Sequence, residues 1–248
     1  MDWASLLILV AAGATAGCLS TMFGIGGGIV MVPAMHYLLR LDWATATGLS
    51  LVAIAVQSPY GIHQHWRRQA VDWRLAWPMA VGGLAGVAMG DFLQPHLPVA
   101  SLKLVFAAVM ALAAYRMLRP DLRARIDRQH VAVVLGLGVA AGILAKLLGI
   151  GGGLLTVPAL VLLGTPIHVA IGSSLVPVFT NAAIATALHA GRGLDVGWGL
   201  ILGAAALATV PLGARAAHSL KAGPLRRLFA AALIVAAAYI AMTRNVGS

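Results

Sequence analysis

The chain has 248 residues, of which 60% are hydrophobic and only 10% are charged, and its formal net charge is +10. This composition excludes an ordinary soluble domain, because apolar runs able to cross about 30 Å of hydrocarbon fill most of the chain. The positive charge lies in short loops between these runs, so it indicates membrane orientation rather than nucleic-acid binding. The single cysteine, Cys18, excludes an internal disulfide and a thiolate metal cluster.

The first half, residues 1–118, is predicted to be one transmembrane repeat. Its first Lys or Arg is Arg40, so the opening run lacks the positive leader of a signal peptide and is expected to be a mature membrane segment. The apolar segments predicted in this half are 3–22, 29–39, 44–65, 75–93 and 99–118. Within the fourth segment, glycines at near four-residue spacing predict close approach of a neighbouring helix: Gly82, Gly83, Gly86 and Gly90.

A basic linker at 119–129 separates this half from a second transmembrane repeat at 130–248. The linker is rich in arginine and is the most polar part of the chain, so we expect it to lie in the cytoplasm. The apolar segments predicted in the second half are 131–148, 154–163, 168–190, 197–217 and 224–242.

The two halves share a glycine-rich motif that interrupts an apolar run. Residues 24–33 read GIGGGIVMVP, and residues 149–158 read GIGGGLLTVP, 125 positions later. Other matches follow in the same order: Gly48 with Gly172, Ser50 with Ser174, Gln57 with Asn181, and His65 with His189. Matches over nearly the whole of each half indicate an internal duplication.

The basic loops change sides between the halves. The loop at 66–74 is basic, whereas its counterpart at 190–197 carries only Arg192; the loop at 91–98 has no Lys or Arg, whereas its counterpart is basic. By the positive-inside rule, equivalent loops then face opposite compartments. We therefore predict an all-α polytopic membrane protein with two inverted-topology repeats. Each repeat would be a glycine-broken helical hairpin of two short arms followed by three transmembrane helices; eight full spans with a broken first helix remain the alternative.

The glycine breaks are the candidate substrate site. Glycine clusters do not hold a helix, and bare backbone in a bilayer is tolerated only against protein or a water-filled cavity. Free N–H groups at helix starts bind anions, and two such ends meeting near the midplane would enclose a small oxyanion. Pro33 and Pro158 are expected in the first turns after the breaks. The alternative is that the glycines only permit tight packing. The glycines predicted to bind substrate are Gly24, Gly26, Gly27, Gly28, Gly149, Gly151, Gly152 and Gly153.

Polar side chains inside the spans are further candidates. The Ser50 and Ser174 hydroxyls could donate to an oxyanion, and the Gln57 and Asn181 amides must find partners away from lipid; for all four, helix–helix hydrogen bonding is an equal alternative. Lys146 lies three residues before Gly149 inside an apolar run, where it would attract an anion or extend its ammonium to an interface.

Two histidines at matched positions, His65 and His189, are candidates for proton coupling, since imidazole titrates near neutral pH. His65 adjoins Trp66 and Arg67 at the end of a span, so an ordinary interfacial position is the competing interpretation for it.

The repeated motif, with the following stretches Gly48-Leu49-Ser50-Leu51 and Gly172-Ser173-Ser174-Leu175, resembles the TauE/SafE sulfite-exporter family over essentially the whole chain. The resemblance implies a secondary transporter, often an exporter, for sulfite or small organosulfonates in a bacterial or archaeal inner membrane. It implies that the glycine motifs and the Ser50, Ser173 and Ser174 stretches form the substrate region.

A small sulfur-containing anion and the lipid bilayer are therefore the expected partners, with no nucleic acid, no cofactor and no metal; a homodimer stays possible. An anion channel of the same architecture is the alternative function. An enzyme is not expected, because no paired carboxylates, nucleophile triad or ATP-binding loop is found in the sequence.

Overall fold

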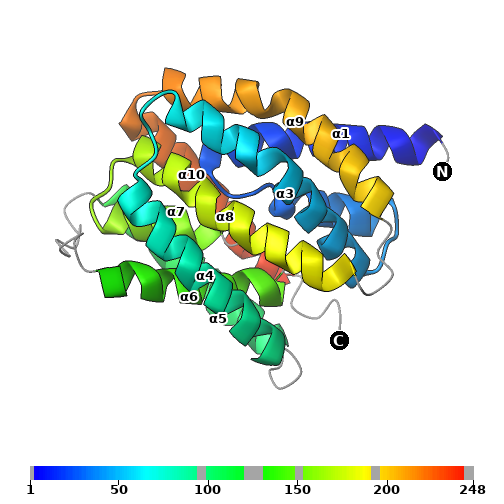
Figure 1. Cartoon of the computed structure of the whole chain (residues 1–248), viewed down its shortest axis with the longest axis horizontal. Helices are drawn as coiled ribbons and strands as arrows, with labels where there is room; N and C mark the ends of the chain where they lie inside the picture. The colour runs from blue at the N-terminus through cyan, green and yellow to red at the C-terminus, as the bar shows by residue number, and fades with distance from the viewer. Residues whose placement is uncertain (1–2, 94–98, 120–130, 149–152, 191–195, 243–248) are drawn as a thin grey trace.

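The computed structural model describes residues 3–93, 99–119, 131–148, 153–190 and 196–242, and within these ranges the chain is helical with no strand (Figure 1). The helices of the first half are α1 (Trp3–Phe23), α2 (Gly28–Pro33), the π-helix η1 (Ala34–Leu38), α3 (Trp43–Trp66), α4 (Trp73–Leu93) and α5 (Val99–Leu118). Those of the second half are α6 (Val131–Leu148), α7 (Gly153–Leu162), α8 (Ile167–Ala190), α9 (Val196–Ser219) and α10 (Ala222–Met242). The predicted apolar segments are confirmed as helices to within a few residues at each end.

Helix length and hydropathy support a multi-pass membrane protein. Among the residues described, α1, α4, α9 and the stretch Ile167–Leu188 of α8 are long and apolar enough to cross a bilayer. At 1.5 Å per residue α1 extends about 31 Å, so the prediction of two short arms is wrong for the first arm. The second arm, Gly28–Leu38, extends only about 16 Å and is short, as predicted.

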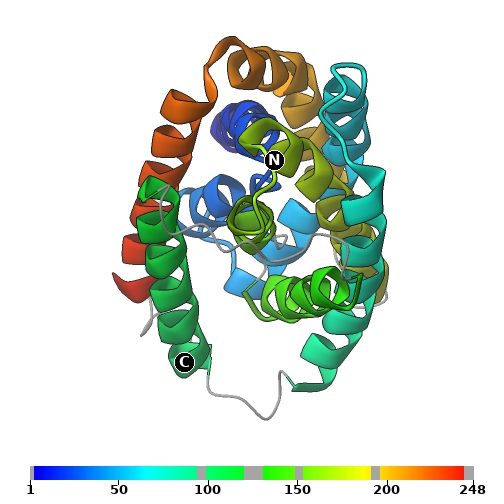
Figure 2. The same ribbon diagram turned by 90° about the vertical axis from the view of Figure 1, so that its left-hand side faces the viewer.

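Each helix pairing recurs when every helix is replaced by its counterpart in the other half. The opening helix α1 packs along α9, and its counterpart α6 packs along α4. In the middle of the molecule α3 crosses α8 (Figure 1). In addition α3 packs against α9, and α8 packs against α4. The last helices, α5 and α10, lie side by side along one edge (Figure 2, green and red). Every one of these pairings joins one half to the other, so neither half buries its apolar faces alone.

Glycines line the closest of these contacts. A Cβ on Gly86 would overlap the carbonyl oxygen of Val139 in α6, and one on Gly17 would overlap the carbonyl of Ala206 in α9. Because glycine has no side chain, these backbones approach closely. Such close packing lets helices associate in lipid, where the hydrophobic effect does not drive them together. The predicted close approach is confirmed at all four positions of α4, where an added Cβ would meet a neighbouring helix: Gly82, Gly83, Gly86 and Gly90.

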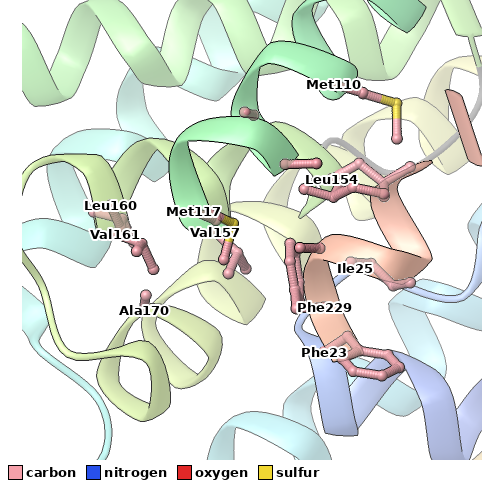
Figure 3. Packing of buried hydrophobic residues seen from close by; sticks show 14 of the residues in the cluster. Phe23, Ile25, Met110, Met117, Leu154, Val157, Leu160, Val161, Ala170 and Phe229 are labelled. Carbon is pink, nitrogen blue, oxygen red and sulfur yellow. The ribbon is translucent and has the colours of Figure 1, made fainter. Parts of the chain in front are cut away.

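An apolar cluster surrounds the first glycine break (Figure 3). Ile25, inside the break, is 4% exposed and packs with Leu154 of α7 in this cluster. Phe23, the last residue of α1, makes an edge-to-face contact with Phe229 of α10, with ring centroids 5.8 Å apart. The break is therefore anchored on both sides of Gly24 by side chains that pack against the second half.

Pro33 lies later in its helix than predicted. It is the sixth and last residue of α2, so it falls beyond the first turn, where the missing N–H would cost least. The ring removes one bond from the helical ladder, and the next residues form the wider π-helix η1. The short arm thus changes helix type at the proline.

Candidate functional site

The first glycine break has a backbone conformation that only glycine adopts without strain. The φ angles of Gly24, Gly26 and Gly27 are 70°, 84° and 84°, in the left-handed region. The N–H of Gly24 donates to the Ser20 carbonyl at 2.7 Å and closes α1, while the Gly27 carbonyl accepts from Met31 at 3.1 Å and begins α2. The glycines therefore end one helix and start the next within four residues.

Side chains from α3 and α8 hold this break in place. The Ser174 hydroxyl lies 2.9 Å from the Gly24 carbonyl oxygen and 2.7 Å from that of Ile171, so its single hydrogen is shared between the two acceptors. The Gln57 amide nitrogen donates to the Gly26 carbonyl at 3.0 Å. Both side chains are buried, so they supply donors to carbonyl groups that water does not reach. Two of the residues predicted to bind substrate are thus brought to the break.

The second glycine motif comes to the same place. A Cβ added to Gly153, the first residue of α7, would overlap the carbonyl oxygen of Gly24 and would lie 2.6 Å from the Cα of Ile25. The backbones of the two motifs are therefore in contact, as the prediction of converging breaks requires. The other predicted glycines of this motif, Gly149, Gly151 and Gly152, lie outside the described residues.

Each of the two matched amides has an oxygen without a partner among the residues described. These atoms are Oε1 of Gln57 and Oδ1 of Asn181, on side chains that are 1% and 2% exposed. Asn181 packs against Gly83 of α4, where a Cβ would overlap its Oδ1. A buried amide that lacks one partner costs free energy, so these positions retain hydrogen-bonding capacity for another group.

The other two predicted serines bond to nearby backbone. The Ser50 hydroxyl donates to the Thr47 carbonyl at 2.8 Å within α3. The Ser173 oxygen accepts from the Asp72 N–H at 2.8 Å and so ties α8 to the start of α4. All four glycines at 24 and 26–28 are buried as well.

Lys146 is paired in a way that the sequence analysis missed. Its ammonium lies 2.8 Å from Oδ1 of Asp91, joining α6 to α4, and the lysine side chain is 2% exposed against 33% for the aspartate. Asp91 lies where the predicted segment 75–93 and the predicted loop 91–98 overlap, and the structure includes it in α4, which continues to Leu93. The signal that could have found the pair is an acidic residue near one end of an apolar segment, together with a single lysine inside another.

His65 is fully buried, so the interfacial position suggested by its neighbours is wrong. Its ring lies beside His218 of α9, which the sequence analysis did not single out, and its other nitrogen bonds to the Thr21 carbonyl at the end of α1. Burial follows because α1 and α9 cover this end of α3. His189 belongs to the last turn of α8, and its side chain is outside what the structure describes.

Comparison with known proteins agrees with this architecture. A probable membrane transporter protein of Xylella fastidiosa (strain Temecula1) is 30% identical over 202 residues, covering 78% of this chain and 77% of its own. The probable membrane transporter protein YunE of Bacillus subtilis is 26% identical over 213 residues, covering 75% and 78%. A probable membrane transporter protein of Methanocaldococcus jannaschii is 26% identical over 195 residues, covering 75% and 73%. The family described as sulfite exporter TauE/SafE matches residues 9–240, so this chain is a membrane transporter that belongs to the TauE/SafE family.

Proposed function

We propose that this transporter moves a small sulfur oxyanion, sulfite or a small organosulfonate, out of the cell across the inner membrane. The family description supports the substrate class. The observation that carries the proposal is the contact between the two glycine motifs, where Gly153 lies against Gly24 and Ile25. Breaks in matched helices of two repeats are where transporters bind ions and anionic groups.

The anion would be bound by main-chain N–H groups of the two motifs and by the amides of Gln57 and Asn181. Their unpaired oxygens are acceptors and would not bind an anion, so each amide would have to turn its NH₂ group toward it. Gln57 would then give up its hydrogen bond to the Gly26 carbonyl. The Ser174 hydroxyl already donates to Gly24, so it would bind the anion only by giving up that bond. Because the break is buried, binding would accompany separation of α3 and α8 from it, which is the motion that alternating access requires.

A basic cavity at the end of α3 would collect the anion. It has a volume of about 280 Å³ and is lined by Gln64, Arg67 and Arg68. Two guanidinium groups give it the charge and hydrogen-bond donors that suit a sulfonate or sulfite. The basic loop that holds them would face the cytoplasm by the positive-inside rule, as would the linker at 119–129.

The inverted-topology arrangement is part of the same proposal. The helix pairings that recur when the halves are exchanged support a duplicated structure. The change of side of the basic loops supports the inversion. An odd number of crossings in each half would then follow if α1 is inclined in the bilayer, because the short arm at Gly28–Leu38 returns to the side on which α1 began only when α1 stops short of the other face.

The experiment is anion exchange in proteoliposomes. Labelled sulfite and isethionate (2-hydroxyethanesulfonate) should exchange with unlabelled anion at a rate that saturates with concentration. Gly27→Leu should abolish exchange, because its side chain would meet Gln57 and the Ala16 carbonyl at the break. Gly136→Leu is the matched control, since a Cβ at Gly136 meets nothing within 4 Å. Exchange that persists in Gly27→Leu would favour a packing role, and fast flux that does not saturate would favour a channel.

A further inference from the structure

Three histidines from three helices meet beside the end of α1. Nδ1 of His65 on α3 lies 3.1 Å from Nε2 of His218 on α9. The ring of His218 stacks on that of His168 on α8, with centroids 5.5 Å apart. His65 is 0% exposed, whereas His218 and His168 are partly exposed. The cluster therefore leads from the surface to a buried imidazole, across helices of both halves.

The hydrogen-bond partners fix where the protons lie when the rings are neutral. Nε2 of His65 lies 2.9 Å from the Thr21 carbonyl, which only accepts, so this nitrogen carries a hydrogen. Nδ1 of neutral His65 is then an acceptor, and the N–H of His218 Nε2 donates to it. His168 likewise donates from Nε2 to the Leu220 carbonyl at 3.1 Å.

This arrangement accepts one extra proton and excludes a second. A proton that binds Nδ1 of His218 makes that ring cationic. The Nε2–H bond of His218 can then break as an N–H bond forms at Nδ1 of His65, which leaves His218 neutral and His65 charged. If both rings were charged, two N–H groups would face each other at 3.1 Å. The geometry would therefore let the pair pass a proton inward over a single hydrogen bond.

His65 connects this proton to the glycine break. Thr21 is in the last turn of α1, three residues before Gly24, and its side-chain hydroxyl bonds back to Gly17. A cation at a helix C-terminus is favoured by the helix dipole, and a charged donor makes a stronger hydrogen bond than a neutral one. Protonation of His65 would thus hold the end of α1 more firmly, and release of the proton would loosen it.

Few other charges act on the pair. Arg68, just beyond α3, is the permanent cation that acts on both rings, and His168 adds a second positive charge when it is protonated. On α9 the nearest other charge is the exposed Arg215, and Lys221 follows this helix on the surface. The α1 helix carries no charged side chain. The described residues of α1, α3, α8 and α9 include no carboxylate. Asp72, on the segment between α3 and α4 that packs against α8, is a carboxylate on an adjoining element, and its Oδ1 accepts from the Arg74 N–H at 3.0 Å.

We propose that His65 and His218 form a binding site for one shared proton, with His168 at its entrance, and that this proton is coupled to anion movement at the glycine break. The coupling rests on the proposed transport function, whereas the proton site does not.

The proton site is tested by ¹⁵N NMR of histidine-labelled protein in lipid bilayers. A ¹⁵N–¹⁵N coupling across the hydrogen bond should join His65 to His218, and acid should charge one ring of the pair, not both. His65→Gln should remove the coupling, and His63→Gln, an exposed position on the same helix, should leave it intact. Two rings that become charged independently, without a coupling, would overturn the proposal.

The coupling is tested with isethionate in proteoliposomes, because its sulfonate stays ionised over the pH range used. With the membrane potential held at zero, one pH unit across the membrane should drive about tenfold accumulation on the acidic side if one proton is exchanged for each anion, which is the direction that export requires. His65→Gln keeps a donor for Thr21 and an acceptor for His218 but cannot carry the proton, so accumulation should be lost while exchange at equal pH persists.

Accumulation that is unchanged in this variant, or accumulation in the wild type that does not depend on the pH difference, would reject the coupling. Absence of exchange in the wild type, with sulfite as well as isethionate, would reject the proposed function and leave the NMR result to judge the proton site.

Discussion

The hydroxyl of Ser174, in the second half of the chain, donates a hydrogen bond of 2.9 Å to the carbonyl of Gly24, in the first half. Gly24 is held in a left-handed conformation, and its carbonyl has left the helical ladder of α1. The second half therefore completes the hydrogen bonding of a break in the first half. A movement of α8 against α1 would be transmitted directly to the glycine segment.

Removing this hydroxyl should destabilise the protein. Ser174→Ala leaves a buried carbonyl with one donor fewer, so we expect the free energy of unfolding to fall by about 1–3 kcal/mol. The matched control is Ser50→Ala, at the equivalent position in α3, because its hydroxyl only bonds back to Thr47 within the same helix. That change should cost about 0.5 kcal/mol or less. Thermal unfolding of both variants in one detergent makes the comparison, and equal losses would contradict the role given to Ser174.

The left-handed backbone at Gly24 gives a second prediction. Gly24→Ala should cost more than about 2 kcal/mol, since an alanine at φ 70° is strained and its Cβ would overlap the Ser174 hydroxyl. Gly136→Ala, in the middle of α6 with open space around it, should stabilise by about 0.5–1 kcal/mol. Differential unfolding temperatures measure both effects. If both alanines were tolerated equally, the first break would not have the conformation described.

The helices could be predicted from the sequence because their signals are local. Apolar runs, glycine clusters and basic loops each mark an element through residues that are neighbours in the chain. The close approach at Gly82 and Gly86 could also be predicted, because spacing alone places these residues on one helix face. The repeat also identified the matched positions Gln57 and Asn181, and both prove to be buried amides whose oxygens have no partner in the described part of the chain.

The pairings between distant residues could not be predicted in this way. The contact of Lys146 with Asp91, and that of His65 with His218, depend on which helices lie side by side, and each joins one half to the other. Exposure was misjudged for the same reason, since the neighbours of His65 in the chain are interfacial while its neighbours in space are α1 and α9. A sequence pattern also does not reveal short-range hydrogen bonds. The bond from the Ser50 hydroxyl to the Thr47 carbonyl, for example, occupies the donor that Ser50 would offer to a substrate.

The start of α3 should show a pH dependence that is separate from the histidines. Asp42 caps this helix by accepting the N–H of Thr45 at 2.9 Å, and hydrogen bonding from the Thr45 side chain, together with this backbone bond, holds the pKa of the carboxyl below its usual value of 3.8. A lowered pKa means that the stabilisation is fully present well above pH 3.8, begins to fall as pH approaches that unfolded value, and is lost only as pH falls through the lower pKa of the folded protein. Asp42→Ala should cost about 0.5–2 kcal/mol at neutral pH, and Asp42→Asn much less. Unfolding curves at pH 7 and pH 3 check both statements; a loss in Asp42→Ala that is the same at both pH values would contradict the capping role.

Variants of the ion pair between Lys146 and Asp91 test whether Lys146 stabilises the fold or binds the substrate. Asp91→Asn leaves a lysine that is only 2% exposed without its counter-charge, so the loss should approach the about 3–5 kcal/mol typical of a broken buried pair. Lys146→Met leaves a carboxylate that is one-third exposed, and water reduces that cost, so the loss should be smaller.

The double variant Lys146→Met with Asp91→Asn removes both charges and should recover most of the stability, giving a positive coupling energy in a double-mutant cycle of unfolding free energies. Because the ammonium is already paired, we expect this variant to keep the exchange of sulfite and isethionate, with an affinity within a few-fold of the wild type. A folded double variant whose anion affinity falls more than about tenfold, a free-energy difference of about 1.4 kcal/mol, would instead show that the positive charge of Lys146 is part of the anion site.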